Sequence, residues 1–400
     1  MPIASRAALA LLGVTIACHT GPPSSTPITI SAPLAARLAP AARAVDSAVT
    51  AGAFPGAVLA VSIRGERYIY GTGRLAQDDA TRPDGQAVYD MASLTKVVAL
   101  TTLAMMAVDD GRLDLDAPVV RYLPRFAAGR GAKDRVTVRD LLLHDSGMPA
   151  HRPLWLQARG RSGAIHVALI SDLDTVPGSR MVYSDLGAIT LATILESLYA
   201  KRIDKLFAER VAGPLGLART RYLPPASWRS VIAPTEQDPW RGRMLRGEVH
   251  DENASRLDGA SGHAGLFSDA EDVLRFSEWA MAGSKGETVD GAPRPPKGFA
   301  TWTLRQDHPA GSSRGLGWDT PSGISSSGTI MSERSFGHTG FTGTSIWVDP
   351  TRDVVIVLLT NRVHPTRNTP QFGQIRGVVA DAVMRALFPD APPRAAHGGN

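Results

Sequence analysis

Strand-like segments gather near the two ends of this chain, and the sequence between them is mainly helical. Near the start, residues 57–63 and 67–71 are rich in β-branched and aromatic side chains and flank the turn Arg64-Gly65-Glu66, a pattern typical of a β-hairpin. Near the end, 345–349 and 354–359 form a second such pair. We therefore expect a mixed α/β (α+β) fold. Its antiparallel sheet, flanked by helices, is built from N- and C-terminal segments with a mostly helical region inserted between them.

The same pattern predicts where the parts of the chain begin and end. With 400 residues and 43% hydrophobic content, the chain can bury a large core. The sheet-containing α/β region is expected over 34–90 plus 290–388 and the mostly helical region over 91–289, together forming one domain. The other expected segments are a helix at 34–51, a helix at 374–387 and a disordered tail at 389–400.

The first 33 residues have the composition of an export signal and a linker. Arg6 precedes the apolar stretch 7–17, which is typical of a secretory signal peptide and too short to span a bilayer. Ile16-Ala17-Cys18 resembles a bacterial lipoprotein box, which would make 1–18 a signal peptide ending at a lipidated Cys18. The alternative is an ordinary signal peptide with an incidental cysteine. Residues 19–33, rich in Pro, Ser and Thr, are expected to be a flexible tether.

Composition excludes several classes of function. The net charge of +5 is scattered without a Lys/Arg run, so a nucleic-acid partner is not expected. Cys18 is the only cysteine, which rules out an internal disulfide. The sequence contains no His-Glu-x-x-His motif or Cys/His cluster, so neither a metal nor a cofactor is implied. The oligomeric state stays open.

Ser93-Leu94-Thr95-Lys96 opens the apolar run 97–108, which is expected to be a buried helix that stops at Gly111. Residues i and i+3 share one helix face, so the Ser93 hydroxyl and the Lys96 amine can meet. The first turn also offers free N–H groups and the positive end of the helix dipole. This arrangement favours an activated serine nucleophile. The alternative is a capping serine followed by a lysine that extends to solvent.

Two later motifs extend this pattern. Tyr183-Ser184-Asp185 precedes a helical run at 186–198, and His338-Thr339-Gly340 lies next to the strand-like 345–349. The ordered set Ser-x-x-Lys, Tyr-x-Asp and His-Thr-Gly resembles the serine β-lactamases and penicillin-binding proteins, and within them the class C-like branch. Flanking segments share the resemblance, which runs from about 54 to 387; they are 141–147, 262–268 and 361–365. It implies a single catalytic domain with its active site between the two regions.

The resemblance implies roles for the motif residues. Ser93 would be the nucleophile, and Tyr183 would carry a proton to the leaving group, although a structural core tyrosine is the alternative. Either Lys96 or Tyr183 could be the base. Asp185 stands where the family usually has Asn, and its charge would favour the Lys96 ammonium. We therefore hypothesise that Lys96 stays protonated and that Tyr183 acts as the base.

The His-Thr-Gly segment would bind substrate. His338 replaces the usual Lys, so we expect it to be neutral at pH 7 and to favour anionic substrates in mild acid. Thr339 belongs to the same binding strand, and Gly340 would let the substrate approach that strand closely. By analogy with the family, the N–H groups of Ser93 and Phe341 would form the oxyanion hole.

The expected function is that of an exported serine hydrolase of the cell envelope, acting through an acyl-enzyme on an amide or ester. A cell-wall-related peptide or muropeptide is the favoured substrate; a carboxylesterase and a β-lactamase are alternatives. A binding or sensor protein that does not turn over is the alternative from another class, but the complete motif set favours turnover.

A second serine motif, Gly311-Ser312-Ser313-Arg314-Gly315, lacks the strand and helix that a nucleophile elbow needs. His144, His263 and His364 are expected to hold loops by hydrogen bonds.

Overall fold

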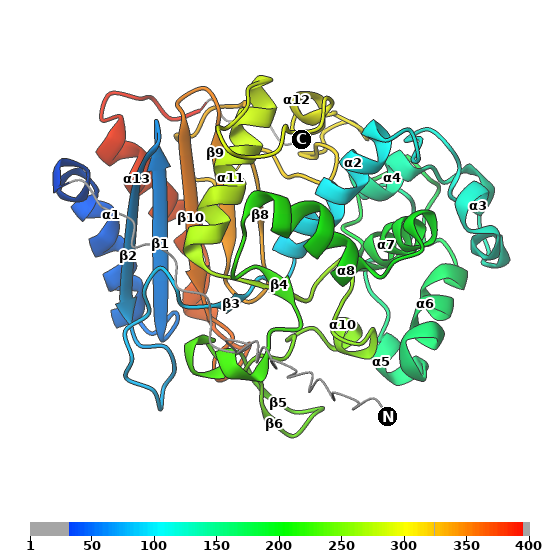
Figure 1. Ribbon diagram of the computed structural model, residues 1–400, viewed down its shortest axis with the longest axis horizontal. Coiled ribbons are helices and arrows are strands. Elements are labelled where there is room, and N and C mark those ends of the chain that lie inside the picture. The colour runs from blue at the N-terminus through cyan, green and yellow to red at the C-terminus, as the bar shows by residue number, and fades with distance from the viewer. Residues whose placement is uncertain (1–31, 324, 395–400) are drawn as a thin grey trace, which may run out of the picture.

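The computed structural model describes residues 32–323 and 325–394 of the chain (Figure 1). The predicted signal peptide with Cys18, and almost all of the predicted tether, lie outside the described residues. Within the described part, no helix is both long enough and apolar enough to cross a bilayer.

One antiparallel sheet joins the two ends of the chain. Its five strands, counted over the described residues, follow the order β2-β1-β10-β9-β8. Their bounds are β1 Gly56–Ile63, β2 Glu66–Gly73, β8 Phe336–Thr339, β9 Ser345–Asp349 and β10 Val354–Thr360. β1 pairs with β10 from Ala57↔Thr360 to Ile63↔Val354, so N- and C-terminal segments are neighbours in the sheet. The predicted sheet is therefore confirmed.

The first hairpin has a tight turn that the sequence encodes directly. Arg64 and Gly65 connect β1 to β2, and both have positive φ angles, 49° and 85°. Two consecutive left-handed residues match the right-handed twist of the flanking strands. Glycine adopts this conformation without strain, which fixes the register of β1 against β2.

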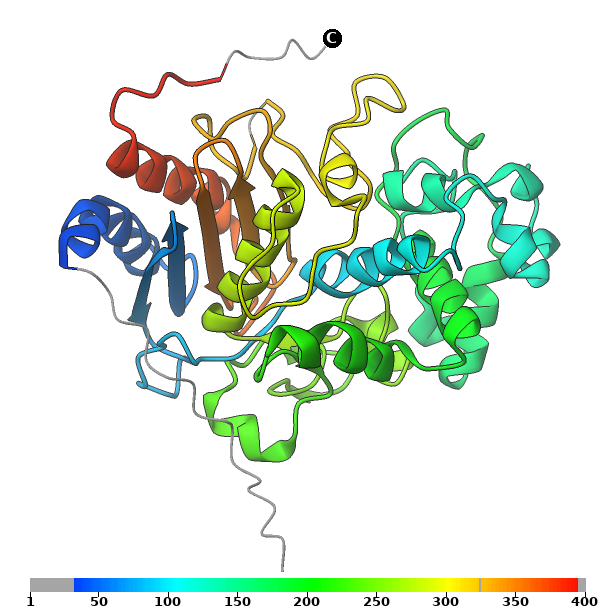
Figure 2. The same ribbon diagram turned by 45° about the horizontal axis from the view of Figure 1, so that its top comes forward.

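Helices cover both faces of the sheet. α1 (Ala32–Thr50) and α13 (Ile375–Leu387) contact each other on one face, and α11 (Ala270–Lys285) packs on β1 and β10 on the other (Figure 2). Every residue of β1 and β10 is buried as a result. Burial on both faces explains why these strands are continuous apolar runs rather than alternating patterns.

The inserted region lies beside the sheet (Figure 1). Its α-helices are α2 Thr102–Asp109, α3 Val119–Tyr122, α4 Val138–Leu143, α5 Leu154–Gln157, α6 Gly160–Ile170, α7 Asp185–Tyr199, α8 Ile203–Phe207, α9 Gly213–Leu215 and α10 Glu252–Arg256, followed by α12 Phe299–Trp302. Short strands are β3 Tyr89–Asp90, β4 Arg221–Tyr222, β5 Gln237–Asp238, β6 Arg243–Met244 and β7 Leu266–Ser268. π-helical turns span Lys96–Thr101 and Ala208–Ala212, and 3₁₀ turns span Pro124–Ala128, Lys133–Arg135, Ala226–Val231 and Pro370–Phe372.

Three local expectations differ from the structure. α11 falls within 91–289, the range predicted for the helical region, yet it packs on the sheet, because its apolar side buries against β1 and β10 on the face opposite α1 and α13. The helix after Ser93 begins as a π-helix and becomes α-helical only at Thr102. Of the tail predicted at 389–400, only 389–394 are described, and Arg394 there donates to the carbonyls of Gly328 and Met331, while 395–400 lie outside the described residues.

Candidate active site

Ser93 lies at the start of the buried helix, where the sheet region meets the helical region. It follows Ala92, whose φ angle of 44° is uncommon for a residue with a side chain. The N–H groups of Leu94, Thr95 and Lys96 then bond three residues back, which closes a tight first turn. The Lys96 Nζ reaches the Ser93 Oγ at 3.1 Å, as the i, i+3 spacing predicts.

Lys96 is buried and carries its charge into the protein interior. Its Nζ lies 2.8 Å from the Asp185 carboxylate at the start of α7, and it also donates to the carbonyl of His263 at 3.2 Å. Burial alone would lower the pKa of Lys96, but the negative charge of Asp185, together with the neighbouring Tyr183, outweighs burial and raises that pKa. Lys96 is therefore an ammonium at neutral pH, which agrees with the charge state hypothesised from Asp185.

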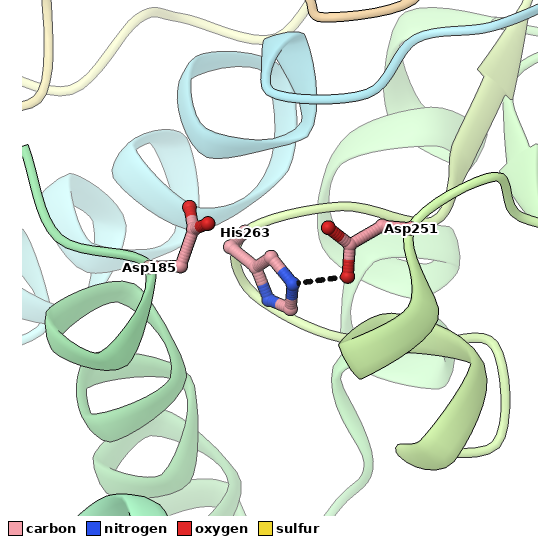
Figure 3. Close-up of side chains that lie close together, drawn as sticks. All are labelled: Asp185, Asp251 and His263. Carbon is pink, nitrogen blue, oxygen red and sulfur yellow. Dashed lines mark hydrogen bonds and ion pairs between the residues drawn. The ribbon is translucent and has the colours of Figure 1, made fainter. Parts of the chain in front are cut away.

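Asp185, Asp251 and His263 lie close together (Figure 3), and Lys96 contacts the Asp185 carboxylate and the His263 carbonyl. His263 Nε2 bonds to the Asp251 carboxylate at 2.8 Å, and its Nδ1 bonds to the Ser261 hydroxyl. Their ligand atoms lie within 4.8 Å of one another, a set that could hold a divalent cation. The Lys96 ammonium already neutralises Asp185, so a cation there would face a like charge. The bonds of His263 to Asp251 and Ser261 instead hold the loop whose carbonyl accepts from Lys96.

Tyr183 lies between cations and imidazoles. The Lys96 Nζ lies 4.7 Å and the Arg314 Cζ 5.2 Å from the centre of its ring. The rings of His144 and His338 lie at 4.5 Å and 5.8 Å. The phenol oxygen is buried and has no hydrogen-bond partner among the described residues. The Tyr183 phenol thus lies within the cleft with two cations beside its ring and with its hydroxyl free for a substrate.

The predicted structural role of the three histidines is confirmed. His144 accepts a hydrogen bond from the Ser184 N–H at its Nδ1, which orients the segment that carries Tyr183. Burial and the charges of Arg314 and Lys96 hold the pKa of His144 well below its usual value, so it stays neutral. His263 joins Asp251 to Ser261, and His364 joins the 77 and 235 segments.

His338 is neutral, and it is more firmly neutral than the sequence predicted. Its Nδ1 donates to the carbonyl of Thr339 at 2.8 Å, and its buried Nε2 has no partner in the described chain. Burial, Arg314 and Lys96 hold its pKa well below the usual value. The expectation that His338 becomes a cation in mild acid is therefore wrong, because two fixed cations lie nearby.

Gly340 ties the end of β8 to the turn before Ser93. A Cβ there would lie 2.1 Å from the Thr344 hydroxyl and 2.6 Å from the Met91 carbonyl. Protein packing therefore excludes a side chain at Gly340, rather than substrate approach as we expected. The N–H groups of Ser93 and Phe341 donate to no other group in the part of the chain that the structure describes. Both donors are thus available for an oxyanion.

These residues border one cleft of about 690 Å³ at the junction of the two regions. Ser93, Tyr183, Asp185 and the 338–341 segment line it, and Lys96 lies directly beneath. Sequence analysis gave no role to the four arginines that also line the cleft: Arg314, Arg362, Arg367 and Arg376. Arg362 lies in the 361–365 segment that shares the resemblance, and Arg314 lies in the dismissed Gly-x-Ser-x-Gly segment, where the Ser313 hydroxyl donates to Asp319 at 2.8 Å.

Comparison with known proteins gives a consistent result. The beta-lactamase family model matches residues 41–379. A putative D-alanyl-D-alanine carboxypeptidase of Salmonella typhi is 30% identical over 319 residues, which cover 72% of this chain and 73% of that protein.

Two solved structures share the fold. One is EstCE1, a hydrolase with promiscuous acyltransferase activity, with a TM-score of 0.65, 22% identity and coverage of 86% of this chain and 99% of that chain. The other is a beta-lactamase/D-alanine carboxypeptidase from Yersinia pestis complexed with citrate, with a TM-score of 0.66, 19% identity and coverage of 89% and 100%.

The site geometry predicts how Lys96 responds to loss of its carboxylate partner. Asp185→Asn removes the charge that raises the pKa of Lys96, so that pKa should fall by about one unit or more. We would measure it by NMR titration of ¹³C-labelled lysine. If the ammonium is the working form, the alkaline limb of the pH–rate profile for an activated ester should shift to lower pH together with the pKa of Lys96.

Asp174→Asn is the matched control, because it removes the same charge from an exposed pair with Arg152. The Asp174→Asn variant should leave both the pKa of Lys96 and the pH–rate profile unchanged. An Asp185→Asn protein with a lowered Lys96 pKa and greater activity at neutral pH would instead identify the free amine as the base.

Proposed function

The chain belongs to the beta-lactamase family and is a serine hydrolase, and from this premise we propose that it is an exported carboxypeptidase or amidase that cleaves a cell-wall-derived peptide. The observation that carries the proposal is Arg314, an uncompensated cation in the cleft. Its side chain is only 9% exposed, and its Nε and Nη1 are buried without a hydrogen-bond partner among the described residues. A guanidinium in this position suits a substrate that brings its own carboxylate.

The reaction would begin with a proton transfer to Tyr183. In this proposal the phenolate of Tyr183, with the Lys96 ammonium and Arg314 beside its ring, takes the Ser93 hydroxyl proton. The Ser93 Oγ then attacks the scissile carbonyl, whose oxygen would accept from the N–H groups of Ser93 and Phe341. As the C–N bond breaks, the Tyr183 hydroxyl returns the proton to the leaving amine. Water attacks the resulting ester with Tyr183 as the base again, which releases the acid and Ser93.

Arg314 lies on the leaving-group side of this site. It lies over the ring of Tyr183, the proposed proton donor to the leaving amine. A leaving D-alanine bears a free carboxylate, which would pair with Arg314. The resemblance to proteins named as D-alanyl-D-alanine carboxypeptidases supports this substrate class. A neutral ester has no group for Arg314, which is why we place the carboxylesterase second.

Localisation is a separate proposal. We propose that the protein is exported and held at the membrane by a lipid on Cys18, because Arg6, the apolar 7–17 stretch and Ile16-Ala17-Cys18 together have the pattern of a lipoprotein signal. The Pro-rich 19–33 segment would then separate the catalytic domain from the bilayer.

Ser93→Ala tests the nucleophile. The variant should lose about 10⁴-fold or more in kcat on a D-alanyl-D-alanine peptide, a muropeptide, a p-nitrophenyl ester and any cephalosporin that the wild type cleaves. Ser313→Ala is the matched control and should keep its activity. The wild type should release product continuously, whereas one equivalent followed by no release would identify a sensor. Loss of activity in Ser313→Ala but not in Ser93→Ala would overturn the assignment.

Arg314→Gln tests the substrate class. It should lower kcat/KM for the D-alanyl-D-alanine peptide by about ten- to a hundred-fold relative to a neutral ester, because a charge-assisted hydrogen bond is lost. Arg334→Gln, which removes an exposed cation, is the control and should change neither rate. An equal fall for peptide and ester would show that Arg314 acts on Tyr183 alone.

Cys18→Ser tests the anchor. Without a lipidated cysteine, the protein should move from the membrane fraction to the soluble fraction of the cell envelope, because one or two acyl chains supply the binding. Detergent partition of both proteins is the measurement. Unchanged partition of Cys18→Ser would exclude lipidation as the means of attachment.

A further inference from the structure

A second group of arginines borders the cleft on the side of Phe341. Arg362, Arg367 and Arg376 all line it, and they repel one another. Arg367 is neutralised by Glu236 and Glu252, at 2.6 Å and 2.7 Å. Arg362 and Arg376 form no ion pair with any carboxylate in the described residues. Buried or half-buried cations are normally paired, so these two call for an explanation.

Neutral acceptors and aromatic rings surround these two guanidiniums. Arg362 donates its Nε to the Phe341 carbonyl at 2.7 Å and its Nη1 to the Arg367 carbonyl and the Thr369 hydroxyl, and it stacks on the ring of Phe341 at 4.5 Å. Arg376 donates to the Gly340 carbonyl at 2.5 Å and stacks on Phe372 at 4.7 Å, but its buried Nε has no partner in the described chain. Neither guanidinium thus has a carboxylate as its own ion-pair partner among the described residues, although the charge of Glu236 acts on Arg362.

The pKa values point the same way. Burial, followed by the charge of Arg367, lowers the pKa of Arg362. Burial and the charge of Arg362 lower the pKa of Arg376 to about 9. The protein thus holds two cations close together at a cost in folding stability. An anion bound between them would reduce their mutual repulsion. Arg376 also lies in the first turn of α13, whose N-terminus has no side-chain cap and adds a positive dipole end.

We propose that Arg362 and Arg376 form a second anion subsite, which binds a carboxylate in the acyl part of the substrate. The inference rests on the proposed function, because it deepens the substrate class of the same cleft. Tyr183 and Arg314 mark the leaving-group side, and Phe341, whose N–H would hold the scissile carbonyl oxygen, lies at the opposite end of the 338–341 segment. A substrate that spans this segment would bring its acyl part to Arg362. The preferred substrate is therefore a peptide with two separate carboxylates.

Two peptides that differ in one charge test the subsite. Both are Nα-acetyl-lysyl-D-alanyl-D-alanine, with the lysine side-chain amine capped by succinyl in one and by the isosteric, neutral succinamoyl group in the other. The full-length wild type should cleave the succinyl peptide with a kcat/KM about ten- to a hundred-fold higher. In Arg362→Gln and Arg376→Gln this ratio should fall to near one, whatever happens to the absolute rates.

Arg385→Gln is the matched control, because it removes an exposed arginine from the last turn of the same helix. It should keep the wild-type ratio. A wild-type ratio near one, or a ratio that survives in both Arg362→Gln and Arg376→Gln, would overturn the subsite. Melting temperatures of the variants identify any that fail to fold. If one of Arg362→Gln and Arg376→Gln does not fold, the ratio measured in the other one tests the subsite.

Equilibrium binding separates this inference from the proposed function. In a Ser93→Ala background, calorimetry should give tighter binding of the succinyl peptide, and Arg362→Gln should abolish the difference. Charge-selective binding without cleavage by the wild type would sustain the subsite and overturn the carboxypeptidase proposal. Cleavage of both peptides at equal rates would sustain the carboxypeptidase proposal and overturn the subsite. Tight binding of free succinate alone, with no preference between the peptides, would identify a general anion site and also overturn the inference.

Discussion

The buried Lys96 ammonium holds the active site together. A charge in the protein interior needs several acceptors, because the loss of water is costly. Lys96 finds them on three separate segments: Ser93 on its own helix, the Asp185 carboxylate at the start of α7, and the His263 carbonyl in the loop after α10. None of these segments can move without leaving the ammonium underpaired. The position of the nucleophile thus depends on the same interaction that sets its electrostatic surroundings.

A second set of contacts joins this assembly to the sheet. The hydroxyls of Thr342 and Thr344 donate to the carbonyls of Asp90 and Met91, and Gly340 packs against the same turn. The strand end and the Ser93 turn are therefore one unit. The two proposed oxyanion donors, on Ser93 and Phe341, come from segments about 250 residues apart that this unit holds in register. The sheet that carries this unit also pairs the first and last parts of the chain as β1 and β10.

Local patterns predicted the framework of the fold, and contacts between distant segments determined the rest. The turn Arg64-Gly65 and the apolar runs around it predicted the first hairpin, because those signals act over a few residues. The place of α11 depends on packing against β1 and β10, which lie far before and far after it in the sequence. The π-helical start after Ser93 also escaped prediction: 97–108 has helical periodicity, whereas the wider turn depends on tertiary contacts such as that of Thr101 with Gly317.

The site shows the same division. Motif order predicted Ser93, Lys96 and Tyr183 because their spacing and sequence neighbours carry the resemblance. Motif order could not predict the arginines. Isolated β-bridges from Arg314 to Asp319 and from Asp319 to Gly337 place Arg314 at the cleft, and no local sequence pattern encodes them. The cations near residue 338 also explain why a histidine fits at this position. With Lys96 and Arg314 already near, a further cation there would face like charges on both sides, so a neutral imidazole fits. The positive charge that the family usually supplies at this position is supplied here from neighbouring segments, and in the proposed reaction it would favour the oxyanion and the substrate carboxylate.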